Sequence, residues 1–403
     1  MNERECKRKF GICFFPWFRL VRGVAFKTVA QLMSNQYKRM RQIAEEIRQL
    51  HGTPLLAIGA ELEKTLDPLL TAQEIDVTGP VNHLIDHLNR LLSALPKTFG
   101  QRFVFDAALV LTLMDEWNPK LKLRRLALPA YDPRWGYRRL ALPSLSRQST
   151  LVFDLFLLPG RDALDDADLL DYPWIMHEMG HCLLHLHPSE FPDAFRVGLE
   201  SHFRNLRLLA VADRGRTREK AAALRQAEQF WTPAEDQHWA HEIAFDVFAL
   251  WTCGPAFIGA FHNTLRDLNP DPFVKKQDHP PYVVRVAALI NAAKKLRFDS
   301  YLRGLSDTYR NQCGAVEQAR KKNDLLLFAP DNLIRDCVDA AISVARNFEL
   351  RRWREVDPDR FLAEPSFGLD LFAAAFKKSQ TGSSNYAEWQ HSVLGKLTAS
   401  VTL

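Results

Sequence analysis

The sequence lacks closely spaced cysteines. This absence bears on the kind of metal site that the chain can form and on the cellular compartment that we expect. Its six cysteines are scattered along 403 residues, and no CxxC motif occurs among them. Such spacing matches neither a disulfide framework nor a zinc site built from thiolates. Scattered cysteines are typical of the reducing cytosol, so we expect a cytoplasmic protein.

Long apolar runs are also missing. An apolar stretch near the N-terminus, from Phe10 to Phe18, is much shorter than the roughly 20 residues that a membrane-spanning helix needs. Arg19 and Arg22 follow it, and no small-residue cleavage site comes after them, so the stretch does not match a signal peptide. We therefore expect no membrane span. We interpret the stretch as a segment packed on the folded body or, alternatively, as a peripheral membrane contact.

The sequence has little net charge and lacks the motifs of several enzyme classes. A formal charge of +5 is small for this length, and no basic stripe interleaved with aromatic residues stands out. We therefore expect no nucleic-acid partner. A GxSxG elbow, a P-loop and a dinucleotide fingerprint are all absent, so hydrolases of the serine class and nucleotide-binding enzymes have little support. Apolar residues at 47% and charged residues at 25% are ordinary for a soluble globular protein.

Helical periodicity dominates what is present. Apolar residues recur at spacings of three and four along residues 29–50 and 80–95. The segment RRLALP occurs twice, at 124–129 and 138–143, and TLVFDLFLLP at 150–159 has the composition of a buried strand. We predict an α+β fold that is predominantly α-helical, with a small β-sheet formed by these three segments.

The chain is too long for one minimal domain. We expect an N-terminal helical region at 1–105, a core that contains the sheet at 106–300, and a C-terminal helical region at 301–403. No low-complexity tract or long flexible linker separates these regions, so we expect them to pack together.

The strongest chemical signal is HEMGH at residues 177–181, in a segment with helical periodicity that follows the predicted sheet. On a helix, His177 and His181 lie one turn apart and point the same way, so both imidazoles can bind one zinc ion. Glu178 projects about 100° round the helix, which lets it reach a zinc-bound water without binding the metal itself. Gly180 removes a side chain beside the metal.

HEMGH on a helix after a short sheet resembles the zincin metallopeptidases, and the resemblance covers about residues 150–290. It implies that residues 106–300 form a zincin-like catalytic core with Zn²⁺ as cofactor. It also implies a zinc-dependent metallopeptidase that hydrolyses a peptide or protein substrate, with Glu178 as general base on a zinc-bound water. The segment at 150–159 would pair with extended substrate. A zincin-fold protein that binds peptides or proteins without catalysis is the alternative.

A catalytic zinc needs a third protein ligand, and two candidates follow the motif closely. His187 gives HExxHxxLxxH, similar to the metzincin pattern, but Leu184 replaces the usual glycine and no methionine follows the motif. Glu200 stands nineteen residues after the motif, a spacing similar to that of aminopeptidases and thermolysin. Arg204 lies four residues further on, and an arginine cannot accept a hydrogen bond from a histidine that binds metal.

Glu242 is the preferred third ligand. Its predicted helix begins with a capping box at 232–235 and ends at Gly254. Glu242 and Asp246 share one face of this otherwise apolar helix, so both carboxylates need partners. The pattern ExxxD resembles the gluzincin branch of the zincins, which implies that Glu242 binds zinc and that Asp246 accepts the N–H of a histidine ligand.

The resemblance also points to a segment downstream of the predicted ligands. Gluzincins commonly use a histidine, tyrosine or arginine there to hold the oxyanion of the tetrahedral intermediate. His279 and Arg285, around the start of the next predicted helix, are candidates for this role.

Overall fold

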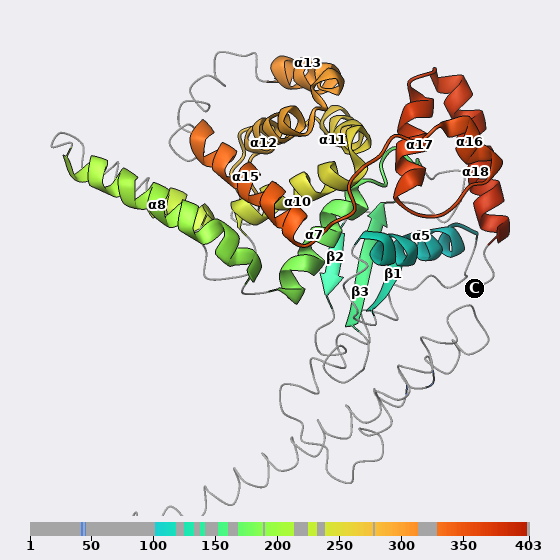
Figure 1. Cartoon of the computed structure of the whole chain (residues 1–403), viewed down its shortest axis with the longest axis horizontal. Coiled ribbons are helices and arrows are strands. Elements are labelled where there is room, and N and C mark those ends of the chain that lie inside the picture. The colour runs from blue at the N-terminus through green and yellow to red at the C-terminus, as the bar shows by residue number, and fades with distance from the viewer. Residues whose placement is uncertain are drawn as a thin grey trace, which may run out of the picture. The chain divides into compact units, whose positions relative to one another are not determined.

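The structure is a computed structural model of the whole chain (Figure 1). It describes Gln42, Glu45 and residues 101–117, 125–132, 138–141, 152–159, 168–187, 190–212, 225–231, 238–276, 279–312 and 329–400. The apolar stretch at 10–18 and, apart from Gln42 and Glu45, the predicted helices at 29–50 and 80–95 lie outside the described residues.

Contacts divide the chain into two compact units, residues 1–95 with 142–153 and residues 96–141 with 154–403. All elements named below belong to the second unit, except the first two residues of β3. This unit holds the HEMGH motif together with residues 301–403, for which the sequence predicts a C-terminal helical region.

The described part of the second unit is predominantly α-helical, as the sequence predicts. Its helices include α5 (Gln101–Trp117), α7 (Trp174–Leu186), α8 (Glu190–Ala212), α10 (Trp239–Cys253), α11 (Pro255–Leu268), α12 (Tyr282–Leu296), η3 (Asp299–Tyr301), α13 (Arg303–Gln312), α15 (Asp331–Asn347), α16 (Pro358–Ala363), α17 (Leu369–Ser379) and α18 (Ser383–Ser400). Within this described part, no helix is both long and apolar enough to cross a membrane.

Three strands precede α7: β1 (Arg125–Asp132), β2 (Arg138–Ala141) and β3 (Val152–Pro159). They form one sheet in the order β1–β3–β2, and β2 pairs with β3 in the antiparallel direction. Helix α5 packs against β1, and α7 contacts β2 (Figure 1). The sheet therefore lies directly beside the helix that carries the motif.

Helix α10 forms the centre of the core. All of its residues are buried, and it packs against α7, α12 and α15. A helix covered on several sides has to be apolar around its whole circumference, which explains its sequence. Its two carboxylates, Glu242 and Asp246, are completely buried as a result.

The ends of α10 agree only partly with the sequence prediction. Gly254 ends the helix as predicted, with a φ of 56° that glycine adopts without strain. The predicted capping box at 232–235 lies outside the described residues, and the helix begins later than predicted, at Trp239. His238 is its N-cap in extended conformation, and its side chain makes no capping hydrogen bond.

Helices α7 and α10 pack tightly against each other at Gly180. A Cβ atom added to Gly180 would lie 2.4 Å from the ring of Phe245, a distance that no real contact allows. Phe245 also packs against the ring of His181, with the ring centroids 4.3 Å apart. The missing side chain at Gly180 thus brings the two helices close enough for their polar residues to meet.

We expect Gly180→Ala to destabilise the protein by about 1–3 kcal/mol, the usual cost of overpacking a dense core. Phe245 has to move, and its displacement shifts the ring of His181 as well, so zinc affinity should also fall. Denaturant unfolding and zinc titration measure the two effects. Gly198→Ala is the matched control, because an added Cβ at Gly198 on α8 meets nothing within 4 Å. Equal stability of the two variants would contradict the close approach.

Candidate metal centre

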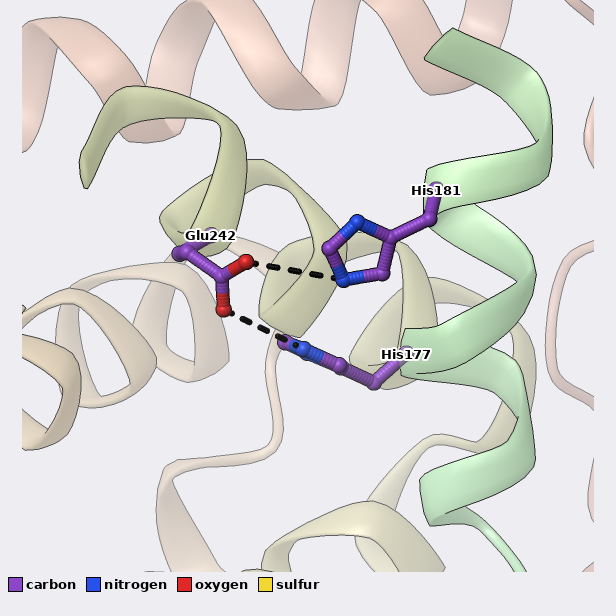
Figure 2. A group of neighbouring side chains, drawn as sticks. All are labelled: His177, His181 and Glu242. Carbon is purple, nitrogen blue, oxygen red and sulfur yellow. Dashed lines mark ion pairs between the residues drawn. The ribbon is translucent and has the colours of Figure 1, made fainter. Parts of the chain in front are cut away.

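Three side chains predicted as metal ligands converge between α7 and α10. His177, His181 and Glu242 each offer one ligand atom, and these atoms all lie within 4.8 Å of one another (Figure 2). His177 Nε2 is 3.4 Å from Glu242 Oε2, and His181 Nε2 is 3.5 Å from Glu242 Oε1. Atoms bound to one tetrahedral zinc at about 2.0–2.2 Å stand roughly 3.4 Å apart, so the spacing fits a shared zinc ion.

The carboxylate of Glu242 is buried without a close hydrogen bond. Both of its oxygens are buried and accept no hydrogen bond from any residue that the structure describes. Burial by itself raises the pKa of Glu242, but the neighbouring imidazoles of His177, His181 and His279 outweigh burial and hold it below its ordinary value. The group is therefore a buried anion that needs a neighbouring cation, which protonated His177 supplies in the metal-free protein and a bound metal ion would supply in its place.

Asp246 holds the opposite edge of the His177 ring. His177 Nδ1 lies 2.9 Å from Asp246 Oδ1, and both side chains are buried. Burial raises the pKa of Asp246, but the charge of Arg285 and its hydrogen bonds lower it below its usual range. A carboxylate can only accept a hydrogen bond, so Nδ1 carries the proton and Nε2 faces Glu242.

The same carboxylates change the pKa of His177. Burial alone lowers this pKa, but the nearby carboxylates of Asp246 and Glu242 outweigh burial and raise it to about 9. In the metal-free protein both ring nitrogens therefore carry protons at neutral pH. A metal ion has to displace the proton on Nε2 before it binds there.

Glu178 borders the three-residue group without belonging to it. Its side chain is almost buried, and Glu178 Oε2 is 4.0 Å from His181 Nε2. This position agrees with the helical spacing, which turns Glu178 away from the two histidines of its own helix.

The two predicted oxyanion residues lie in different surroundings. Arg285, in the first turn of α12, is buried, and its Nε and Nη2 atoms donate to the two oxygens of Asp246 at 2.8 and 2.6 Å. His279 precedes the helix with 44% of its side chain exposed, and its Nε2 is 3.6 Å from Glu242 Oε2. His279 therefore lies on the solvent side of the group, and Arg285 lies behind it.

The competing third ligands lie elsewhere. Glu200 on α8 has 52% of its side chain exposed, and its Oε1 pairs with Arg196 at 3.7 Å. His187 is the C-cap of α7, and its ring packs against that of Phe348. Neither residue is part of the group that could hold a metal ion among the described residues.

Two features near the site are not evident from the sequence. Trp174 and Phe261 pack against the guanidinium of Arg285, with both ring centroids 5.3 Å from its Cζ atom. His238 is buried and packs against His241, with the ring centroids 3.5 Å apart. The contacts of Arg285 join residues far apart in the sequence, so local spacing does not indicate them.

Comparisons of the chain with protein-family models, with curated proteins and with solved structures found no significant match.

Proposed function

We propose that this protein is a zinc-dependent metallopeptidase with a zincin-like core of the gluzincin branch. His177, His181 and Glu242 hold the zinc ion, and Glu178 is the general base. The carrying observation is the buried carboxylate of Glu242, which accepts no hydrogen bond from the described residues and lies between two imidazole nitrogens at 3.4 and 3.5 Å. Two histidines and one glutamate are also a donor set that catalytic zinc prefers.

A bound zinc ion would supply a Lewis acid that activates water and polarises the scissile carbonyl. Glu178 lies close enough to the ligands to take the proton of the attacking water and pass it to the leaving amine. Asp246 keeps the Nδ1 proton of His177 in place and thereby fixes the orientation of the ring. His279 is the more accessible of the two oxyanion candidates, because Arg285 is buried against Asp246.

A protein that binds peptides without cleaving them is the second candidate function. Such a protein needs no proton acceptor beside the metal, yet Glu178 has an almost buried carboxylate there, where burial is unfavourable for a charge. The position of Glu178 therefore favours the enzyme.

The protein purified in zinc-sparing buffer should contain about one zinc ion per chain, since three protein ligands converge on one point. A strong chelator should remove the metal, and added zinc should restore it. Elemental analysis after gel filtration measures the ratio. A protein that contains no divalent metal and takes none up would contradict the proposal.

Apparent zinc affinity should rise with pH up to about pH 9. His177 has a pKa of about 9 in the metal-free protein, so below this pH a proton competes with the metal. Release of one proton lowers the apparent affinity about tenfold for each pH unit below that value. Competitive zinc titration at several pH values measures the slope. An affinity that does not change with pH would contradict His177 as a ligand.

The stability of the metal-free protein should change in the opposite direction. The folded-state pKa of His177 is raised, so protonated His177 stabilises the fold fully below its unfolded-state pKa of about 6.5. This contribution is lost as the pH rises through about 9. Thermal unfolding of the chelated protein should therefore show that the stability gained from His177 decreases between pH 6.5 and about pH 9. The variant His177→Gln should not show this decrease.

A further inference from the structure

Arg285 occupies a closed position behind the metal centre. Its guanidinium joins α12 to α10 through both oxygens of Asp246, and the residue is only 6% exposed. The rings of Trp174, Phe261 and Tyr282 lie 5.3, 5.3 and 5.9 Å from its Cζ atom. Aromatic faces stabilise a cation and keep water away, so this arginine is held by its surroundings on several sides.

The fork of the guanidinium fixes the plane of the Asp246 carboxylate. Arg285 Nε donates to Oδ2 and Nη2 donates to Oδ1, which is the bidentate geometry of an arginine–carboxylate pair. Oδ1 is also the atom that lies 2.9 Å from His177 Nδ1. One oxygen therefore links the guanidinium to the imidazole, and a rotation of the carboxylate would break both contacts.

The ion pair of Arg285 with Asp246 also gives the two buried carboxylates, Asp246 and Glu242, different electrostatic surroundings. Asp246 is neutralised by the guanidinium of Arg285, whereas the ion pairs of Glu242 among the described residues are with the imidazoles of the site. The charge that remains for a metal ion is then that of Glu242. Without Arg285, both carboxylates would compete for His177 and for any bound cation.

We infer that Arg285 is a positioning residue of the metal centre: it clamps Asp246 so that His177 presents Nε2 to the metal. This role rests on the proposed zinc site and differs from that of an oxyanion donor, because a buried guanidinium bonded to Asp246 does not reach a substrate. A lysine has the charge but not the fork, so Arg285→Lys should keep only part of the function.

A double-mutant cycle tests the role of Arg285, with zinc as the probe and competitive titration as the readout. Arg285→Gln should lower zinc affinity about 10- to 100-fold, the usual effect of losing a group that supports a ligand. Arg285→Lys should lower it less. In the Asp246→Asn background, Arg285→Gln should cause no further loss, because Arg285 acts through Asp246.

Arg351→Gln is the matched control for a loss of stability alone. Arg351 pairs with Glu116 and Asp370 outside the metal centre, so this variant should unfold at a lower temperature and keep its zinc affinity. Zinc affinity that is unchanged in Arg285→Lys and Arg285→Gln, or that falls equally in both Asp246 backgrounds, would overturn the inference. If the wild-type protein itself takes up no zinc, the proposed function fails instead. If Arg285→Gln does not fold, Arg285→Lys is compared in the wild-type and Asp246→Asn backgrounds. A loss of zinc affinity in the wild-type background alone supports the inference, and an equal loss in both or no loss overturns it.

Discussion

Glu242→Ala is expected to lower zinc affinity by several orders of magnitude. The substitution removes one of three protein ligands and the one negative charge among them, and two neutral imidazoles hold zinc far more weakly. It also takes a buried charge partner away from protonated His177 and leaves a cavity, so the metal-free variant should be less stable than the wild type. Competitive zinc titration gives the affinity, and circular dichroism checks that α10 is intact.

Two further variants should rank between Glu242→Ala and the wild-type protein in zinc affinity or match the wild type. Asp246→Ala should weaken zinc binding about 10- to 100-fold, since Asp246 orients His177 without touching the metal. Glu200→Ala is the matched control, because this exposed glutamate on α8 pairs only weakly with Arg196 and should leave the affinity unchanged. Loss of zinc in Glu200→Ala with retention in Glu242→Ala would reverse the assignment of the third ligand.

Glu178→Gln is expected to abolish peptide hydrolysis and to leave zinc binding intact. Glutamine has nearly the shape of glutamate but cannot accept the proton of the attacking water. Loss of a general base typically lowers the rate about 10²- to 10⁴-fold. The measurement is kcat on any peptide that the wild-type protein cleaves, with the zinc content of both proteins determined from the same preparation.

The paired zinc measurement separates chemistry from metal loss. If Glu178→Gln retains one zinc ion and loses activity, Glu178 acts in the reaction and not as a ligand. Wild-type activity in this variant would show that another residue is the base or that the activity comes from a contaminant. A protein that binds peptides without cleavage would bind them equally well in both forms.

The sequence predicted the motif helix well because local spacing determines its geometry. Helical periodicity around HEMGH predicted a helix there, and α7 runs from Trp174 to Leu186. A separation of four residues is enough to put His177 and His181 on one face. No distant contact is needed for either prediction.

The sequence also allowed the position of Glu242 to be predicted, for an energetic reason. A helix that is apolar around its circumference has to be buried, and a carboxylate on it needs a partner. The two carboxylates of α10 are indeed completely buried, and the structure places Glu242 beside His177 and His181. Glu200, by contrast, lies on a helix whose polar face is exposed.

The contacts of Arg285 could not be predicted, because they arise from tertiary packing. Arg285 and Asp246 are 39 residues apart, on separate helices whose crossing sets the distance between them. The resemblance to gluzincins suggested a role at the oxyanion, whereas the structure places the guanidinium against Asp246. The sequence also predicted the start of α10 too early, at the capping box of residues 232–235. The N-cap is His238, whose side chain makes no capping hydrogen bond, so no capping signal in the sequence marks this start.

The location of a bound metal ion tests the central claim most directly. Crystals of the zinc-loaded protein, measured on both sides of the zinc absorption edge, should give one strong anomalous peak per chain. The peak should lie about 2.0–2.2 Å from His177 Nε2, His181 Nε2 and a carboxylate oxygen of Glu242. A peak bound by other residues, or no peak between α7 and α10 in crystals grown with excess zinc, would contradict the account.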